Sequence, residues 1–298
     1  MEHRRAVILT FARGETCLHP LDRFPLEDRR QRLTHALWVD LLAATSEEIA
    51  LVSATLHVEL FSPDELHEIE ESSRIFVEQD DLNLICWLPS FEGEVPINMP
   101  VGLIADHERL ISMRQGDFPA FRTYTEPRRR SGLPRVASSA DMLVDLLDTI
   151  VGHLASTLRT LEQDLNSLTT EIFSDDERPR TRFPRPRGFR GRTSFRDLKG
   201  IVQRLGRRNA LVANLRDSAV TLSTLIPFII ANGRHWAGPD AVARLKLVGK
   251  DIASLRDYTG QLSAEISFLL DSTMGLITID ENQSMKFLGV AALVVAFV

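Results

Sequence analysis

The sequence contains only two cysteines among its 298 residues, Cys17 and Cys86. Two cysteines cannot build the disulfide framework of a small secreted scaffold, so the chain suits a reducing compartment. The apolar stretch AVILTFA near the N-terminus is too short for the core of a signal peptide. We therefore expect this stretch to form the first β-strand of a folded domain.

Motifs of enzymes are also missing. The sequence has no phosphate-binding loop and no nucleophile motif, and its eight histidines are scattered rather than spaced as metal ligands. An enzyme is therefore not expected. The formal net charge of −6 argues against a generic nucleic-acid-binding protein, so no nucleic-acid partner is expected.

No apolar run is long enough to cross a membrane. A spanning helix needs about 20 predominantly apolar residues. The uncharged run that ends the chain, Phe287 to Val298, has 12 residues and reaches little more than half way. Either this run closes a buried core helix, or it is the truncated beginning of a membrane helix.

Residues 1–135 have the pattern of an α/β or α+β domain. ALWVDLL at 36–42 is typical of a strand, and Thr45 with Glu48 has the spacing of a capping box. Ser62, Pro63 and Glu65 give three helix-start signals in SPDELHEIEESSR. The stretches RIFVEQDDLNLICWL and VGLIADHERLISMRQ each hold two β-rich runs around a polar turn, which predicts antiparallel hairpins.

The rest of the chain is predicted to be helical. Residues 136–236 form a long antiparallel hairpin of helices, 138–173 and about 195–230, whose tip at 175–194 contains prolines and glycines. A stalk helix follows at 237–284, beginning with Pro239, and leads into the truncated membrane helix at 285–298. Apolar residues recur along the stalk every three or four positions: Leu245, Val248, Ile252, Leu255, Leu262, Ile266 and Leu269. This seam could pack on the chain's own hairpin, but its length favours a bundle of identical helices.

Beyond this seam, positions spaced by seven change to polar or small residues. Asp271, Thr278 and Met285 form one row, with Asn282 in the row beside it. In a symmetric bundle such rows would stack as rings around a pore that could hold hydrated cations. Taken singly, these residues are more often solvated or simple core filler.

The hairpin tip carries eight arginines and no acidic residue between Arg178 and Arg196. Because the second hairpin helix runs antiparallel to the stalk, the tip should approach the membrane, where arginines bind anionic headgroups. We expect Arg182, Arg185, Arg187, Arg190 and Lys286 at the membrane interface. A solvated linker that neutralises the neighbouring acidic residues is the alternative for the arginines.

Three stretches of the sequence resemble the CorA family of magnesium transporters. They are SPDELHEIEESSRIF, VGLIADHERLISMRQGDFPAFRTY and DSTMGLITIDENQSMKFLGV, so the likeness covers nearly the whole chain. The resemblance implies a funnel-shaped homopentameric channel for divalent cations, chiefly Mg²⁺ and also Co²⁺ or Ni²⁺, in the cell inner membrane. Most of the chain would be cytoplasmic, and intracellular Mg²⁺ would gate the pore. The family's Gly-Met-Asn motif and second membrane helix do not occur in this sequence.

The resemblance also implies roles for single residues. Asn282, Met285 and Leu288 match the pore mouth and hydrophobic gate of the family, and Asp271 matches an acidic ring lower on the stalk. Glu68 matches an acidic residue of a regulatory Mg²⁺ site between subunits, with Asp251 as its partner on the stalk. Two alternatives stay open, a zinc transporter of the same superfamily and a tail-anchored coiled-coil scaffold that transports nothing.

Overall fold

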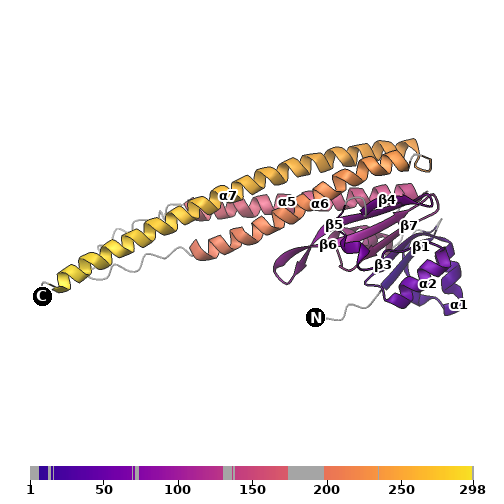
Figure 1. The fold of residues 1–298 in the computed structure, drawn as a ribbon, viewed down its shortest axis with the longest axis horizontal. Helices are drawn as coiled ribbons and strands as arrows, with labels where there is room; N and C mark the ends of the chain where they lie inside the picture. The colour runs from indigo at the N-terminus through magenta and orange to yellow at the C-terminus, as the bar shows by residue number, and fades with distance from the viewer. Residues whose placement is uncertain are drawn as a thin grey trace. The chain divides into compact units, whose positions relative to one another are not determined.

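The computed structural model describes residues 7–12, 15, 17–68, 70, 74–129, 136, 138–173, 198–233 and 235–296 (Figure 1). The chain forms two compact units. The first comprises Met1–Thr157 and Asn214–Tyr258, and the second comprises Leu158–Ala213 and Thr259–Val298. Each of the three long helices contributes residues to both units.

The first unit contains a mixed seven-stranded sheet with the strand order β2-β1-β3-β7-β6-β5-β4. Strands β3 and β7 pair in parallel, and all other neighbours are antiparallel. The strands are β1 (Val7–Ala12), β2 (His19–Pro20), β3 (Ala36–Leu42), β4 (Ile75–Glu78), β5 (Asp81–Glu92), β6 (Val95–Ala105) and β7 (Leu110–Arg114). The predicted first strand, the strand at 36–42 and both predicted hairpins are confirmed.

Local signals in the sequence explain where the first helices begin. In α2 (Ser46–Leu56), the Thr45 side chain accepts a hydrogen bond from the Glu48 backbone and the Glu48 side chain accepts one from the Thr45 backbone. This is the predicted capping box. Ser62 and Glu65 exchange the same pair of hydrogen bonds, 2.7 and 3.2 Å long. They open only the short 3₁₀ helix η2 (Glu65–His67), so the expectation of an α-helix from Ser62 was wrong for these residues.

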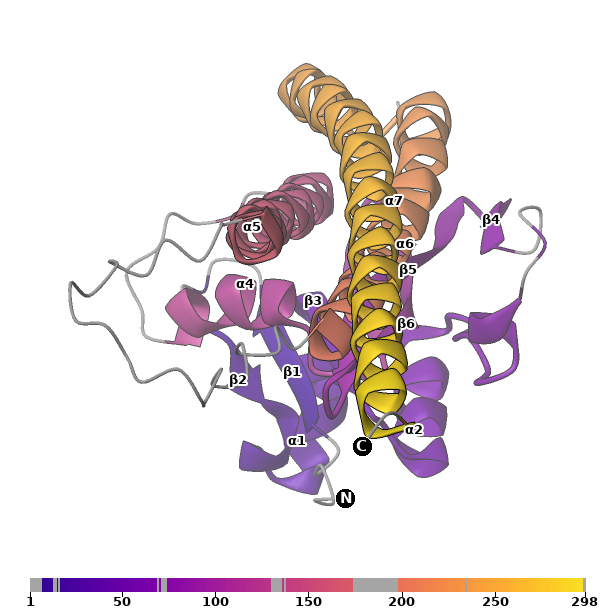
Figure 2. The same ribbon diagram turned by 90° about the vertical axis from the view of Figure 1, so that its left-hand side faces the viewer.

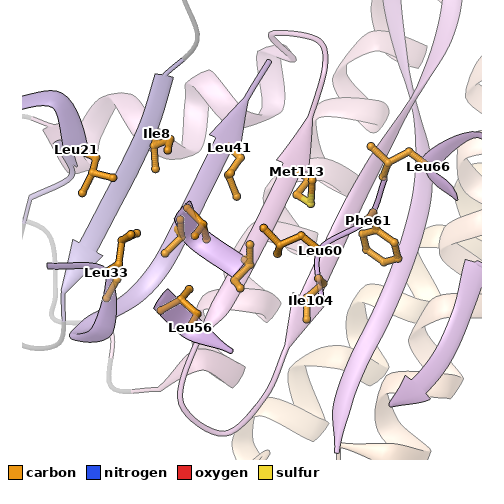
Figure 3. Packing of buried hydrophobic residues seen from close by; sticks show 14 of the residues in the cluster. Ile8, Leu21, Leu33, Leu41, Leu56, Leu60, Phe61, Leu66, Ile104 and Met113 are labelled. Atoms are coloured by element: carbon orange, nitrogen blue, oxygen red, sulfur yellow. The ribbon is translucent and has the colours of Figure 1, made fainter. Parts of the chain in front are cut away.

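Helices cover both faces of the sheet in the first unit (Figure 2). On one face, α1 (Leu26–Thr34) and α2 pack with the 3₁₀ helix η1 (Leu21–Arg23) and with η2. The buried side chains on this face include Ile8, Leu33, Leu41, Leu56, Phe61, Ile104 and Met113 (Figure 3). The other face carries α4 (Pro119–Arg129) and α5 (Ser139–Phe173), whose Met142 carbonyl accepts a hydrogen bond from the Tyr124 hydroxyl. The sheet therefore forms the middle layer of this unit.

A buried ion pair lies on the α4 side of the sheet. The Arg114 guanidinium donates to the Asp40 carboxylate over 2.7 and 3.0 Å, and the Ser112 hydroxyl donates to the same carboxylate over 2.7 Å. Trp38 donates its indole N–H to Ser112, and Arg114 stacks over the Phe121 ring. Burial alone would lower the pKa of Arg114, but the neighbouring Asp40 carboxylate raises it above its ordinary value. Side chains alternate between the two faces along β3 and β7, so these polar groups point to the same face of the sheet.

The long helices agree with the sequence-based expectation. They are α5, α6 (Leu198–Asn232) and α7 (Pro239–Ala296), and α7 is unbroken over 58 residues. In the first unit, Arg244 of α7 donates to Asp145 of α5 over 2.6 Å, and Gly249 of α7 lies close to Ile226 of α6. In the second unit, ion pairs join α6 to α5: Arg204 with Glu171 and Arg208 with Asp164. The three helices thus run side by side within each unit.

The apolar seam of α7 is buried by the chain itself. Leu245, Ile252, Leu262, Ile266 and Leu269 all expose 2% of their surface or less in a single chain. The prediction that this seam joins identical helices was therefore wrong. It packs within the chain, because α5 and α6 offer two apolar helices at short distance in sequence, and burying the seam there removes its surface from water.

We predict that Arg114→Met lowers the free energy of unfolding by about 3–5 kcal/mol. The substitution leaves Asp40, which is fully buried, without its opposite charge. Urea unfolding monitored by far-UV circular dichroism measures the loss.

A matched control is Arg204→Met, which breaks the solvent-exposed Arg204–Glu171 pair and should cost less than about 1 kcal/mol. The double variant Asp40→Leu/Arg114→Met should recover part of the loss, because it removes both buried charges. Equal losses for Arg114→Met and Arg204→Met would contradict the assignment of the buried pair as a main stabilising contact.

Candidate ion pathway and cation-binding residues

The predicted pore-lining row lies on an exposed face of α7. Asp271, Thr278, Asn282 and Met285 are all solvent-exposed in the single chain, and Met285 exposes 63% of its surface. The Thr278 hydroxyl donates to the Met274 carbonyl over 3.0 Å, so its lone pairs stay open to solvent. The side chain of Leu288 lies outside the described residues, although the helix backbone continues past it.

Helix geometry places this row opposite the buried seam. Each residue of an α-helix turns by about 100°, so Asp271 lies about 200° around the axis from Leu269. Leu269 and Thr273 are buried, while Asp271, Thr278 and Asn282 are exposed. The polar row therefore occupies the face of α7 that its own chain leaves uncovered.

The residues expected at a regulatory metal site are both exposed. Glu68 directly follows η2, and Asp251 lies on α7. Within the ranges that the structure describes, no three His, Cys, Asp or Glu side chains lie close enough together to hold a metal ion. A site at Glu68 and Asp251 thus remains a prediction that needs further ligands.

The residues expected at the membrane are placed only in part. Lys286 is exposed on α7, whereas Arg182, Arg185, Arg187 and Arg190 lie outside the described residues. One helix segment among the described residues, Pro239–Ile279, is long and apolar enough to cross a membrane by length and composition. Charged side chains such as Lys250, Asp251 and Glu265 recur along it, so this test by itself does not identify a membrane span.

Sequence reasoning missed an acidic pocket in the first unit. It has a volume of about 400 Å³ and is lined by Ser53, His57, Val58, Glu59, Glu78, Gln79, Asp81 and Asn83. The lining residues come from the end of α2 with the residues after it, and from the β4–β5 turn with its flanks. The only sequence signal was the run of polar residues EQDDLN, which we assigned to a hairpin turn.

Asp81 of this pocket is half-buried and has a shifted pKa. Burial, followed by the negative charge of Asp106, raises the pKa of Asp81 to about 6, although Arg109 acts in the opposite direction. Asp81 also pairs with Glu78 across β4–β5, but Glu78 is exposed and is not among the groups that shift this pKa.

We predict that Asp81→Asn stabilises the protein by about 1 kcal/mol at pH 7.5 in the absence of divalent cations. The folded chain holds its Asp81 proton more tightly than the unfolded chain. The native carboxylate therefore costs stability above about pH 6, and this cost disappears as the pH falls below about 4. The gain is small because Asp81 is only half-buried, so water screens its charge.

Urea unfolding of the wild type and the variant at pH 7.5 and at pH 4 measures this difference. Glu92→Gln is the matched control, because Glu92 is exposed at the other end of β5 and is not among the groups that shift the pKa of Asp81. A stability gain of Asp81→Asn that is the same at both pH values would contradict a cost of the ionised Asp81 carboxylate.

Comparison with known proteins places the chain in a family. A family model described as "CorA-like Mg2+ transporter protein" matches residues 34–184. A magnesium transport protein CorA from Mannheimia succiniciproducens is 29% identical over 269 residues, covering 89% of this chain and 78% of the relative. Another, from Pasteurella multocida, is 27% identical and covers 92% of this chain and 84% of the relative.

Solved structures share the fold. The CorA magnesium transporter from Methanocaldococcus jannaschii aligns with 97% of this chain and 82% of its own, with a TM-score of 0.66 at 15% identity. The ZntB cytoplasmic domain from Vibrio parahaemolyticus aligns with 92% of this chain and 98% of its own, with a TM-score of 0.58 at 13% identity. The family model covers half of the chain, and the relatives align along most of it. The chain belongs to the CorA-like Mg²⁺ transporter family.

Proposed function

We propose that this chain is one subunit of a channel that carries Mg²⁺ across a membrane, with Co²⁺ and Ni²⁺ as further ions. The observation that carries the proposal is the exposed row Asp271, Thr278, Asn282 and Met285 on the free face of α7. Membership of the CorA-like family, whose relatives are named magnesium transport proteins, supports the choice of ion.

The channel is proposed to be a homopentamer. Besides the row, α7 leaves several large apolar side chains exposed in the single chain: Leu247, Phe268, Met274 and Ile279. Such residues on a helix that has already buried its own seam favour contacts with neighbouring copies. A ring of copies related by rotation would bring the same row of each α7 to one axis.

The chemistry of the row suits a hydrated ion. Mg²⁺ gives up its water shell reluctantly, so a fast path must contact the bound waters rather than strip them. The Asn282 amide and the Thr278 hydroxyl can accept hydrogen bonds from those waters, and Asp271 attracts cations toward the path. Met285 and Leu288 would form an apolar constriction of the pore, further along α7 toward its C-terminal end.

The proposed orientation keeps most of the chain in the cytoplasm of the cell. The backbone of α7 is helical to Ala296, and the sequence beyond Lys286 carries no charge. Lys286 and the arginines Arg182, Arg185, Arg187 and Arg190 would then meet anionic headgroups of the inner membrane on its cytoplasmic side.

A regulatory Mg²⁺ between subunits is the second part of the proposal. Glu68 and Asp251 are exposed, and one chain offers no complete metal site among its described residues. Acidic residues on neighbouring copies would repel each other, and a shared cation would relieve that repulsion. Loss of Mg²⁺ at low concentration would then loosen the ring and open the gate.

The similarity to a ZntB domain keeps Zn²⁺ as an alternative cargo, and a coiled-coil scaffold would transport nothing. We favour Mg²⁺ because the relatives aligned over most of this chain are named for magnesium transport. Uptake assays with each ion separate these possibilities.

We predict that the protein, expressed with any residues its gene encodes after Val298, takes Mg²⁺ into liposomes as a particle of five chains. Asn282→Ala should lower Mg²⁺ uptake about tenfold or more, because it removes an amide that would contact the bound waters. Fluorescent Mg²⁺ indicators measure uptake, and native mass spectrometry counts the 33.5 kDa chains.

Cysteine cross-linking tests which face of α7 meets the neighbouring copies. In a background without Cys17 and Cys86, Asn282→Cys should cross-link between copies several times faster than Glu281→Cys, whose side chain points about 100° away. A monomeric particle, or uptake of Zn²⁺ but not Mg²⁺, would rule out the proposal.

We predict that Mg²⁺ slows proteolysis of the assembled protein and that Glu68→Gln removes this protection. The substitution takes away one carboxylate of the proposed shared site and leaves the single chain intact, because Glu68 is exposed. Limited digestion with Mg²⁺ or a chelator measures the effect. Glu70→Gln, an exposed acid two residues further on, is the control and should keep the protection. Equal digestion of the wild type under both conditions would contradict regulation by Mg²⁺.

A further inference from the structure

Two short rows of exposed side chains flank the polar row of α7 in the second unit. Met274 and Glu281, seven positions apart, form the first row, and Ile279 and Lys286 form the second. Met274 and Ile279 expose 54% and 56% of their surface. Each row thus holds an apolar residue followed by a charged one, and the charges of the two rows are opposite.

Helix geometry puts the two rows on opposite sides of the direction in which Asp271 points. Each residue turns by about 100°, so Met274 and Glu281 lie about 60° and 80° from Asp271 in one sense. Ile279 and Lys286 lie about 80° and 60° from it in the other sense. In a ring of five copies with Asp271 toward the axis, the two neighbours of a helix lie about 54° to either side. The first row of each copy would therefore face the second row of the next.

The single chain leaves both rows uncovered. Their four side chains are exposed, whereas Leu269 and Thr273 of the same helix are buried. Within the part of the chain that the structure describes, no ion pair includes Glu281 or Lys286. These two residues point about 140° apart on their own helix, so they do not face each other within one chain.

We propose that the neighbouring copy of this chain covers the two rows, with Ile279 packed on Met274 of the next copy. Lys286 forms an ion pair with Glu281 of that copy at the same contact. The inference rests on the proposed ring of copies and specifies the residues that join them. Charge complementarity favours this partner, because opposite charges at positions that flank the shared face of parallel helices select partner and register.

Both contacts have the same offset along the helix. Ile279 follows Met274 by five positions, and Lys286 follows Glu281 by five, so one arrangement of the ring satisfies both pairs. Five positions correspond to about 7.5 Å of rise. Side chains of a helix lean toward its N-terminus, and the long lysine side chain can reach back over that distance toward the carboxylate.

The contact would fix the rotation of each α7 about its own axis. A helix that turned by one residue would separate Lys286 from its partner and would also turn Asp271 and Thr278 away from the path. Glu281 and Lys286 are therefore positioning residues, which act on the ion through the polar row and touch no ion themselves. Lys286 directly precedes the uncharged end of the chain, so lipid headgroups compete for its ammonium group.

Paired cysteines test the contact in the full-length protein. In the background without Cys17 and Cys86, Glu281→Cys/Lys286→Cys should form disulfides that join copies into a ladder longer than a dimer. Within one chain these two Cα atoms lie about 8–9 Å apart, too far for a disulfide. The matched controls are the two single variants, which should cross-link several times more slowly because like positions do not face each other.

Exchange of the charges tests the ion pair. Glu281→Lys and Lys286→Glu should each lower the assembled fraction and Mg²⁺ uptake several-fold, because each sets like charges face to face in every contact. The double variant Glu281→Lys/Lys286→Glu should restore both quantities, which native mass spectrometry and liposome uptake measure. If Lys286 bound only headgroups, Glu281→Lys would leave assembly unchanged and the exchange would restore nothing, and this result would overturn the ion pair.

Failure of this contact and failure of the channel give different results. An assembled particle that carries Mg²⁺, while Glu281→Cys/Lys286→Cys cross-links no faster than the single variants, would overturn the contact alone. Ladders from a protein that takes up no Mg²⁺ would support the contact and contradict the channel. A monomeric particle would overturn both.

Discussion

Burial of one face of α7 within its own chain is the constraint that shapes the rest of the molecule. Leu245, Ile252, Ile266 and Leu269 bury almost all of their surface in a single chain. A helix of 58 residues turns its remaining surface to solvent, and that surface carries Asp271, Thr278 and Asn282. The packing of the apolar seam therefore decides that the polar row points to solvent, since the two lie on opposite sides of one helix.

The sheet of the first unit places its polar groups in two different ways. On the α4 side, Asp40 and Arg114 are buried but fully paired, and Ser112 and Trp38 complete their hydrogen bonds. Near the β4–β5 turn, burial and the charge of Asp106 raise the pKa of Asp81, although Arg109 acts in the opposite direction. The first arrangement satisfies its buried charges, whereas the ionised Asp81 carboxylate costs stability.

The two acidic sites of the proposed channel differ in what would complete them. Asp271 lies on an exposed helix face, and in the proposal identical copies would complete its ring. Glu68 and Asp251 are exposed in one chain, and the proposed regulatory site would take further ligands from a neighbouring copy. In that proposal both sites would respond to the same cation, one through assembly and the other through binding.

The sequence by itself determined the helices, most strands and the capping box at Thr45 and Glu48, because these depend on periodicity and on contacts between near neighbours. It also contained the polar row of α7, since positions spaced by seven share a face in any long helix. Only the tertiary structure decided that the apolar seam packs on α5 and α6, that Asp40 meets Arg114 74 residues away, and that α2 closes a pocket over Asp81 and Asn83. These outcomes depend on which distant surfaces meet. The hydrophobic effect is non-directional, so a local sequence pattern shows that a surface will be buried but not against which partner.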